Sequence, residues 1–189
     1  MIKTIIGKKD FCEYLRGKSA TFLLSLSNTK TAQIDGITQA GIPGMIHLTP
    51  TLDSEFVCIG DVRSLPHIAQ TPKGVPTPAL IARATHLLYP FKQIELLNLG
   101  LEVIPKVGHF LIHNFNINPS QSIDVGANID ACEIFQKGVA FGQSYEPKSD
   151  YVILGESVPS GTTTALATAM ALGYDAGDKF SSSFALNPT

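Results

Sequence analysis

Charge of one sign is not in excess in this sequence. Fourteen Lys and Arg residues oppose sixteen Asp and Glu residues, which leaves a formal net charge of −2 at pH 7. Proteins that bind the phosphate backbone of nucleic acids carry basic stripes or patches. The composition offers no such excess, so we expect no nucleic-acid partner.

Long apolar runs are also missing. The most apolar segment, residues 165–174, falls well short of the ~20 residues that a transmembrane helix needs. The N-terminus places only Ile5 and Ile6 before Lys8 and Lys9, which is too short for the apolar core of a signal peptide. We therefore expect a cytoplasmic protein with no membrane partner.

Cysteines are few and far apart. Cys12, Cys58 and Cys132 form no CxxC pair. This distribution favours buried, inert thiols in a reducing compartment over a disulfide framework or a zinc site.

A histidine pair is the remaining candidate for metal binding. His109 and His113 have the i, i+4 spacing that would place two imidazoles on one face of a helix. Gly108 and Asn114 flank the pair, and no Glu occupies the position found in HExxH sites. We therefore expect a surface or core pair, and no metal site.

The residues that are present are enough for one hydrophobic core. The chain has 189 residues, 44% of them hydrophobic, and a domain of this size buries about 70% of its unfolded surface. No linker or internal repeat divides the chain. We expect a single domain over residues 1–189.

Short apolar runs alternate with helical patterns along the chain. Runs typical of strands buried on both faces of a parallel sheet occur at residues 21–27, 55–60, 93–99 and 151–156. Helical patterns occur at residues 77–91, 129–145 and 162–173. This alternation predicts an α/β fold with a mainly parallel sheet, in which ligands bind beyond the carboxyl ends of the strands.

Residues 151–173 carry the strongest functional signal, because they combine a buried strand, a tight loop and a helix start. Gly161 allows the backbone to approach a ligand closely. Free amides of Thr162, Thr163 and Thr164 would hold a phosphate, assisted by the helix dipole and three hydroxyls. The alternative is an ordinary helix cap, because Thr and Gly are common at that position.

Two sharper motifs do not fit this segment. Five residues separate Gly155 from Gly161, and Thr162 stands where the Lys of a Walker A loop is required. A GxSxG nucleophile elbow at Ser157 would need a His later in the chain, but all five histidines precede it. The segment is therefore not a nucleoside-triphosphatase loop. The order of Ser157 and the histidines argues separately against a serine hydrolase.

Glu156 stands at the carboxyl end of the predicted strand, where α/β enzymes place groups that face substrate. A carboxylate repels phosphate, so its partners would be ribose hydroxyls or the N–H of a base. A loop carboxylate without function is the alternative. The loops at Asn28–Thr31 and Thr71–Gly74 lie at or near predicted strand ends, and we expect them to close the site, with contacts from Asn28, Thr31, Lys73 and Gly74.

Several segments together resemble a family related to nicotinate-nucleotide:dimethylbenzimidazole phosphoribosyltransferase, found in archaea and cyanobacteria. The resemblance rests on GESVPSGTTTALATAMALGYDAGDKFSSS, on LSNTKTAQIDGITQAG with LTPTLDSEF within residues 24–56, on TPKGVPTPALIARA at 71–84, and on SSS…NP at 181–188. It spans nearly the whole chain.

The resemblance implies a three-layer, Rossmann-like α/β fold, usually a homodimer, and no metal or organic cofactor. It implies transfer of phosphoribosyl from nicotinate mononucleotide to a dimethylbenzimidazole- or adenine-type base, which releases nicotinate and supplies the lower ligand of cobamides. The phosphoribosyl end of the nucleotide would contact Gly155, Glu156, Ser160, Gly161, Thr162, Thr163 and Thr164.

Two departures from the family pattern bear on function. Ser160 stands where the family commonly has Gly, which tightens the loop. Proteins of this kind are about twice as long, and the general-base Glu of the related transferases lies in their C-terminal part. Glu156 is the catalytic candidate within these residues. Two hypotheses therefore stand: the N-terminal portion of a phosphoribosyltransferase-like enzyme, and a non-catalytic module that binds a nucleotide or phosphate.

Overall fold

The computed structural model describes residues 7, 11–68, 70–71 and 73–181. The strands are β1 (Ala20–Leu26), β2 (Gln93–Asn98), β3 (Leu111–Asn114) and β4 (Tyr151–Ser157). The α-helices are α1 (Phe11–Leu15), α2 (Thr49–Ile59), α3 (Ala79–Leu88), α4 (Ala131–Ser144) and α5 (Gly161–Ala171). Single turns of 3₁₀ helix lie at Lys30–Gln33, Ile46–Leu48 and Ile123–Val125.

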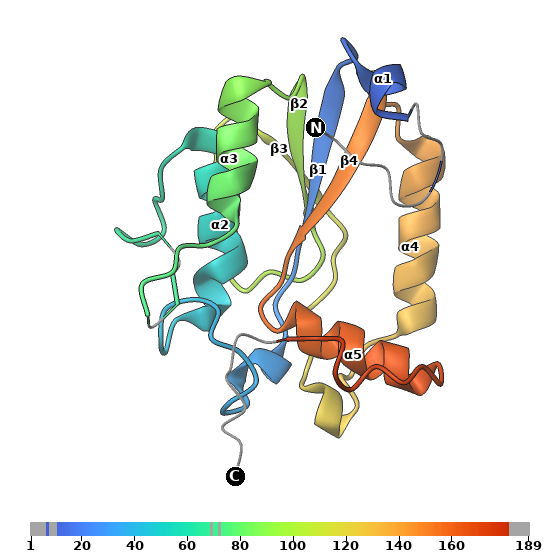
Figure 1. The fold of residues 1–189 in the computed structure, drawn as a ribbon. Coiled ribbons are helices and arrows are strands. Elements are labelled where there is room, and N and C mark those ends of the chain that lie inside the picture. The colour runs from blue at the N-terminus through green and yellow to red at the C-terminus, as the bar shows by residue number, and fades with distance from the viewer. Residues whose placement is uncertain (1–6, 8–10, 69, 72, 182–189) are drawn as a thin grey trace.

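The strands form one parallel sheet in the order β3-β2-β1-β4 (Figure 1). In the centre, Leu24 of β1 pairs with Leu96 of β2 on one side and with Gly155 of β4 on the other. All but one residue of β1 are buried, as the apolar run at its position predicts. β4 is an edge strand and alternates between half-buried and exposed residues.

The connections place helices on both faces of the sheet. The chain passes from β1 to β2 through α2 and α3, and from β3 to β4 through α4. Figure 1 shows α2 and α3 on one face and α4 on the other. The chain leaves β1 towards α2 on one face, and it leaves β4 towards α5, which Figure 1 shows at the carboxyl ends of the strands. Connections that diverge from two adjacent strands in this way leave a crevice at their carboxyl ends. This arrangement confirms the expected three-layer α/β fold with a parallel sheet.

The hydrophobic core lies between the sheet and the pair α2 and α3. Side chains of β1 and β2 pack there against the helices, and the buried members of this core are Phe22, Leu24, Leu26, Val57, Cys58, Ala79, Ile94, Leu96, Leu101 and Val107. Arg83 of α3 donates to the carbonyls of Val57 and Cys58 at 3.0 and 3.1 Å, which satisfies the last turn of α2.

The other face of the sheet is covered less completely. His113 of β3 and Glu95 of β2 are joined at 2.6 Å, and the Tyr145 hydroxyl, just after α4, donates to Glu95 at 3.2 Å. Phe141 of α4 packs edge-on against the His113 ring. Beyond this cluster, Leu154 of β4 is 63% exposed, so α4 leaves part of the apolar face open.

The expected strand at residues 55–60 is wrong, because residues 55–59 belong to α2 and Gly60 caps that helix. Pro50 lies in the first turn of this helix, and Gly60 ends it in the left-handed region (φ 74°). A short apolar run is compatible with either element, and the signals that settle it are Pro near the start and Gly after the end. The expected strands at 21–27, 93–99 and 151–156 and the three expected helices are confirmed.

Two further differences concern β3 and the cysteines. β3 has only four residues and was not expected. Cys58 is buried, and burial raises the pKa of its thiol to about 12. Cys12 and Cys132 are exposed, so the expectation of buried thiols is wrong for them. They lie on α1 and on the first turn of α4, where neither helix has a buried residue.

Candidate functional site

The loop between β4 and α5 makes a tight turn at Ser160. This residue adopts the left-handed conformation (φ 62°) that glycine favours. The amides of Thr163 and Thr164 donate to the Ser160 carbonyl at 3.0 and 3.2 Å, so they are not the free donors that the sequence predicted. The amides of Gly161 and Thr162 have no hydrogen bond to the described residues, and they are the donors that α5 has left for a ligand.

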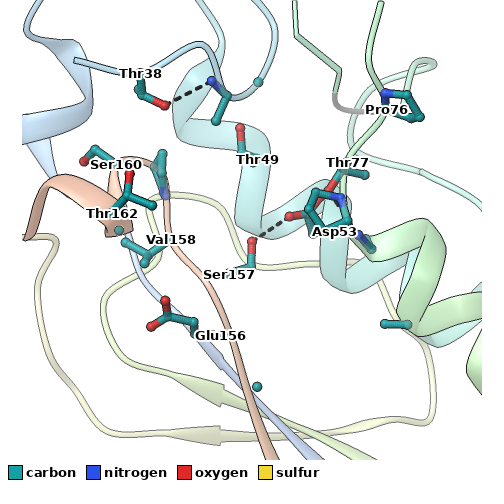
Figure 2. A pocket seen from close by; sticks show the side chains of 18 of the residues that line it. Thr38, Thr49, Asp53, Pro76, Thr77, Glu156, Ser157, Val158, Ser160 and Thr162 are labelled. Atoms are coloured by element: carbon teal, nitrogen blue, oxygen red, sulfur yellow. Dashed lines mark hydrogen bonds between the residues drawn. The ribbon is translucent and has the colours of Figure 1, made fainter. Parts of the chain in front are cut away.

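A pocket of about 600 Å³ lies at this loop (Figure 2). Its walls come from the middle of β1, from the carboxyl end of β4, from α2, from the loop before α3 and the start of α3, and from the start of α5. This is the crevice that the strand order predicts. The volume is in the range of small-molecule sites, which are typically about 300–1,000 Å³.

Five of the predicted site residues line this pocket, namely Gly155, Glu156, Ser160, Gly161 and Thr162. Ser160 is 3% exposed, and its Oγ has no hydrogen-bond partner among the described residues. A buried hydroxyl without a partner is uncommon in folded proteins. A ligand bound at the start of α5 would supply the missing hydrogen bond.

Glu156 is exposed on β4, and its carboxylate lies near the start of α5. Its Oε1 is 3.4 Å from the position that a Cβ on Gly161 would take. The positive end of the helix dipole favours a carboxylate there. The side chain has no hydrogen bond to the described residues, so both oxygens are available to a donor such as a ribose hydroxyl.

Packing leaves no room for a side chain at Gly155 of the pocket wall and little room at Gly161. A Cβ on Gly155 would lie 2.7 Å from the ring of Phe22, which packs across the strand. A Cβ on Gly161 would lie 3.1 Å from Cγ1 of Val158. A larger side chain at Gly161 would therefore collide with the loop and fill the approach to α5.

α2 contributes polar groups that the sequence analysis did not single out. Thr49, Asp53 and Val57 are four residues apart on one face of the helix, and all three line the pocket. Ser157 Oγ donates to Asp53 Oδ2 at 2.6 Å, as the dashed line in Figure 2 shows. Asp53 Oδ1 and Thr49 Oγ1 are buried and have no hydrogen-bond partner among the described residues.

Asp53 is electrostatically unusual. It is 8% exposed, and burial raises the pKa of its carboxyl above the ordinary value of 3.8, against the opposing effect of the Ser157 and Thr77 hydroxyls. The sequence signal for this residue was available. Thr and Asp at i, i+4 in a helix that begins beside Pro50 share one face, but assigning residues 55–60 to a strand concealed it.

Asn28 and Thr31 lie outside the pocket wall and hold loops together. Asn28 Nδ2 donates to the His47 carbonyl at 2.8 Å, and its Oδ1 accepts from the Glu102 amide at 2.9 Å. Thr31 is fully buried, and its Oγ1 accepts from the Ile123 amide at 3.1 Å. These contacts join the loop after β1 to the loops after β2 and β3.

The other predicted residues lie beside the pocket. Thr163 and Thr164 are on the first turn of α5, and Lys73 and Gly74 are exposed in a loop whose neighbours Gln70, Thr71 and Val75 line the pocket. The structure therefore brings together the core of the predicted phosphate loop and leaves the more distant contacts at its margin.

The histidine pair does not converge. His109 precedes β3 and His113 lies within it, so the helix that would align the two rings is absent. Among the described residues, no group of three or more His, Cys, Asp or Glu side chains could hold a metal ion. No helix in the same part of the chain has the length and apolar content to cross a membrane.

Comparison with curated proteins finds archaeal relatives along the whole chain. A UPF0284 protein of Saccharolobus solfataricus is 35% identical over 191 residues, which cover 100% of this chain and 53% of the relative. A UPF0284 protein of Archaeoglobus fulgidus is 38% identical over 191 residues, which cover 99% of this chain and 55% of the relative. The chain thus spans about half the length of the curated relatives it matches. No family model matches it.

Proposed function

We propose that this chain forms the nucleotide-binding part of a phosphoribosyltransferase that uses nicotinate mononucleotide. The observation that carries the proposal is the buried, unpartnered hydroxyl of Ser160 beside the unbonded amides of Gly161 and Thr162. Three donors at one helix start suit the oxygens of a phosphate, and the helix dipole adds to their attraction.

The position of Glu156 supports a phosphorylated sugar over inorganic phosphate. Its carboxylate lies close to the start of α5, where it would repel an isolated anion. A ribose between the phosphate and the rest of the ligand would offer hydroxyl donors to Glu156. Firm binding of both groups is what a reaction at the adjoining anomeric carbon requires.

The remainder of the proposal comes from the resemblance of the sequence segments. It specifies nicotinate mononucleotide as donor and a dimethylbenzimidazole- or adenine-type base as acceptor, in a cytoplasmic homodimer that serves cobamide synthesis. In this transfer the bond from C1′ to the nicotinate nitrogen breaks, a bond from C1′ to the acceptor nitrogen forms, and the acceptor base loses a proton.

Calorimetric titration of the 189-residue chain with nicotinate mononucleotide tests the proposal. We expect saturable binding, and we expect the Gly161→Val variant to weaken it at least about tenfold by blocking the start of α5. Gly138→Val is the matched control, because Gly138 is also helical but has open space around it. Equal affinity in wild type and Gly161→Val would overturn the phosphate assignment.

Chromatography of the same mixture after addition of dimethylbenzimidazole or adenine separates the two hypotheses. Release of nicotinate identifies the transferase within these residues. Binding without release identifies a non-catalytic nucleotide-binding module, the alternative left open by the sequence. Absence of binding removes both.

A further inference from the structure

The pocket has a second polar position, on the wall opposite α5. Of the described side chains with a buried and unpartnered polar atom, three line this pocket: Thr49, Asp53 and Ser160. Ser160 belongs to the phosphate loop, whereas Thr49 and Asp53 come from α2. Figure 2 shows Ser160 and Asp53 on opposite sides of the pocket. Buried polar atoms that gather in one pocket without partners point to a ligand that completes them.

The α2 position requires a hydrogen-bond donor. An ionised carboxylate only accepts hydrogen bonds, and Asp53 forms no ion pair with any described Lys, Arg or His side chain. Ser157 satisfies Oδ2, whereas Oδ1 is buried in the pocket wall without a hydrogen-bond partner among the described residues. Burial without a cation makes the ionised form of Asp53 costly, and a donor from the ligand would offset that cost.

The surroundings of Asp53 favour an apolar, planar group. The apolar residues that line the pocket with Asp53 are Phe22, Leu24, Val57, Pro76, Pro78 and Ala82, and the Thr77 hydroxyl lies beside its carboxyl. Sugar hydroxyls need more polar partners than one carboxylate and the hydroxyls of Thr49 and Thr77 supply within this mainly apolar wall. A heteroaromatic ring with one N–H does match a single carboxylate oxygen within apolar walls.

We propose that Asp53 Oδ1, with Thr49 beside it, recognises the ring N–H of a planar heteroaromatic base bound against the apolar wall of the pocket. This proposal rests on the proposed function, in which the phosphoribosyl group occupies the α5 side and the acceptor base the α2 side. Asp53 is then the residue that determines which bases are accepted.

Two isomers of one base provide the test. 5-Methylbenzimidazole keeps the ring N–H, whereas 1-methylbenzimidazole carries its methyl group on that nitrogen and has no N–H. The two molecules have the same composition and nearly the same volume. We expect wild type to bind the 5-methyl isomer at least about tenfold more tightly, because a buried acceptor without a donor is costly. In Asp53→Leu the preference should fall below about twofold, and in Asp53→Asn it should be intermediate.

Asp175→Leu is the matched control, because Asp175 is exposed and outside the pocket, and it should keep the wild-type preference. Circular dichroism checks that each variant is folded. If Asp53→Leu does not fold, Asp53→Asn takes its place in the comparison. Equal affinity of wild type for the two isomers, binding of neither, or a preference retained in Asp53→Leu would each overturn the proposal.

The nicotinate mononucleotide titration reports separately on the proposed function. Loss of nucleotide binding with retained selectivity between the isomers would remove the phosphoribosyl assignment and leave Asp53 as a base-recognition residue. Nucleotide binding without that selectivity would remove only the role of Asp53.

Discussion

Asp53 and Glu55 lie two residues apart on α2, and both are buried, but their surroundings differ. Glu55 is fully buried and accepts four hydrogen bonds, from the Arg63 amide, the Ser64 amide and hydroxyl, and the Lys106 amide, at 2.6 to 2.9 Å. Asp53 accepts a short hydrogen bond from Ser157, the Thr77 hydroxyl lies near enough to oppose the effect of burial on its pKa, and its Oδ1 is buried in the pocket wall without a hydrogen-bond partner among the described residues.

The two carboxyls consequently shift in opposite directions. Burial raises the pKa of both, but for Glu55 the hydrogen bonds from Ser64, Lys106 and Arg63 outweigh burial and lower its pKa below 4.5. For Asp53 burial prevails and the pKa lies above 3.8. A buried carboxylate with all partners supplied by the chain stabilises the fold, whereas one that lacks partners destabilises it and is available to a ligand.

Removing the charge of Glu55 should have the largest effect. Glu55→Gln places an amide NH2 group against two of the four donors and should lower the free energy of unfolding by about 3 kcal/mol. Urea denaturation at neutral pH measures the change. The control is Glu102→Gln, because Glu102 is exposed. A loss below about 1 kcal/mol would show that the four hydrogen bonds do not stabilise the fold as described.

The same change at Asp53 should have the opposite sign. Asp53→Asn should raise the free energy of unfolding at neutral pH by about 1 kcal/mol, because it removes a buried and incompletely paired charge. The measurement is urea denaturation of both proteins under identical conditions. A loss of stability similar to that of Glu55→Gln would end the contrast between the two carboxyls.

The pH dependence should separate the two residues further. The pKa of Glu55 is lower in the folded than in the unfolded chain, so its stabilisation is present above 4.5 and is lost as pH falls through the folded value. The folded pKa of Asp53 is raised, so its destabilisation disappears as pH falls from that value towards 3.8. The gain from Asp53→Asn should therefore shrink at acid pH, and a gain independent of pH would contradict this account.

The smallest expected effect concerns the other side of the pocket. Ser160→Gly removes a left-handed serine and an unpartnered hydroxyl, and it should raise the free energy of unfolding by about 0.5 kcal/mol after the added freedom of the unfolded chain is counted. Ser122→Gly is the control, because Ser122 also has a buried, unpartnered hydroxyl but a φ of −70°. Thermal unfolding should show a loss of stability for Ser122→Gly. A loss of stability in both variants would indicate that the backbone at Ser160 is not strained.

Much of the fold follows from local patterns. Buried strands and amphipathic helices produce periodicities that neighbouring residues alone determine, and they predict β1, β2, β4, α3, α4 and α5. β3 has only four residues, too few for a pattern, and it forms because β2 is beside it. Residues 55–60 show the limit of the method, since a short apolar run fits a strand or a helix.

The sequence by itself determined the α/β class and the candidate phosphate loop, because strand, loop and helix are contiguous around Gly161. Only the tertiary structure decided which buried carboxylate of α2 lines the pocket and lacks hydrogen-bond partners. Ser157 and Asp53 are 104 residues apart in the chain, and the partners that satisfy Glu55 come from two separate loops. The environment of a buried charge depends on segments that are distant in sequence, so local patterns carry no record of it.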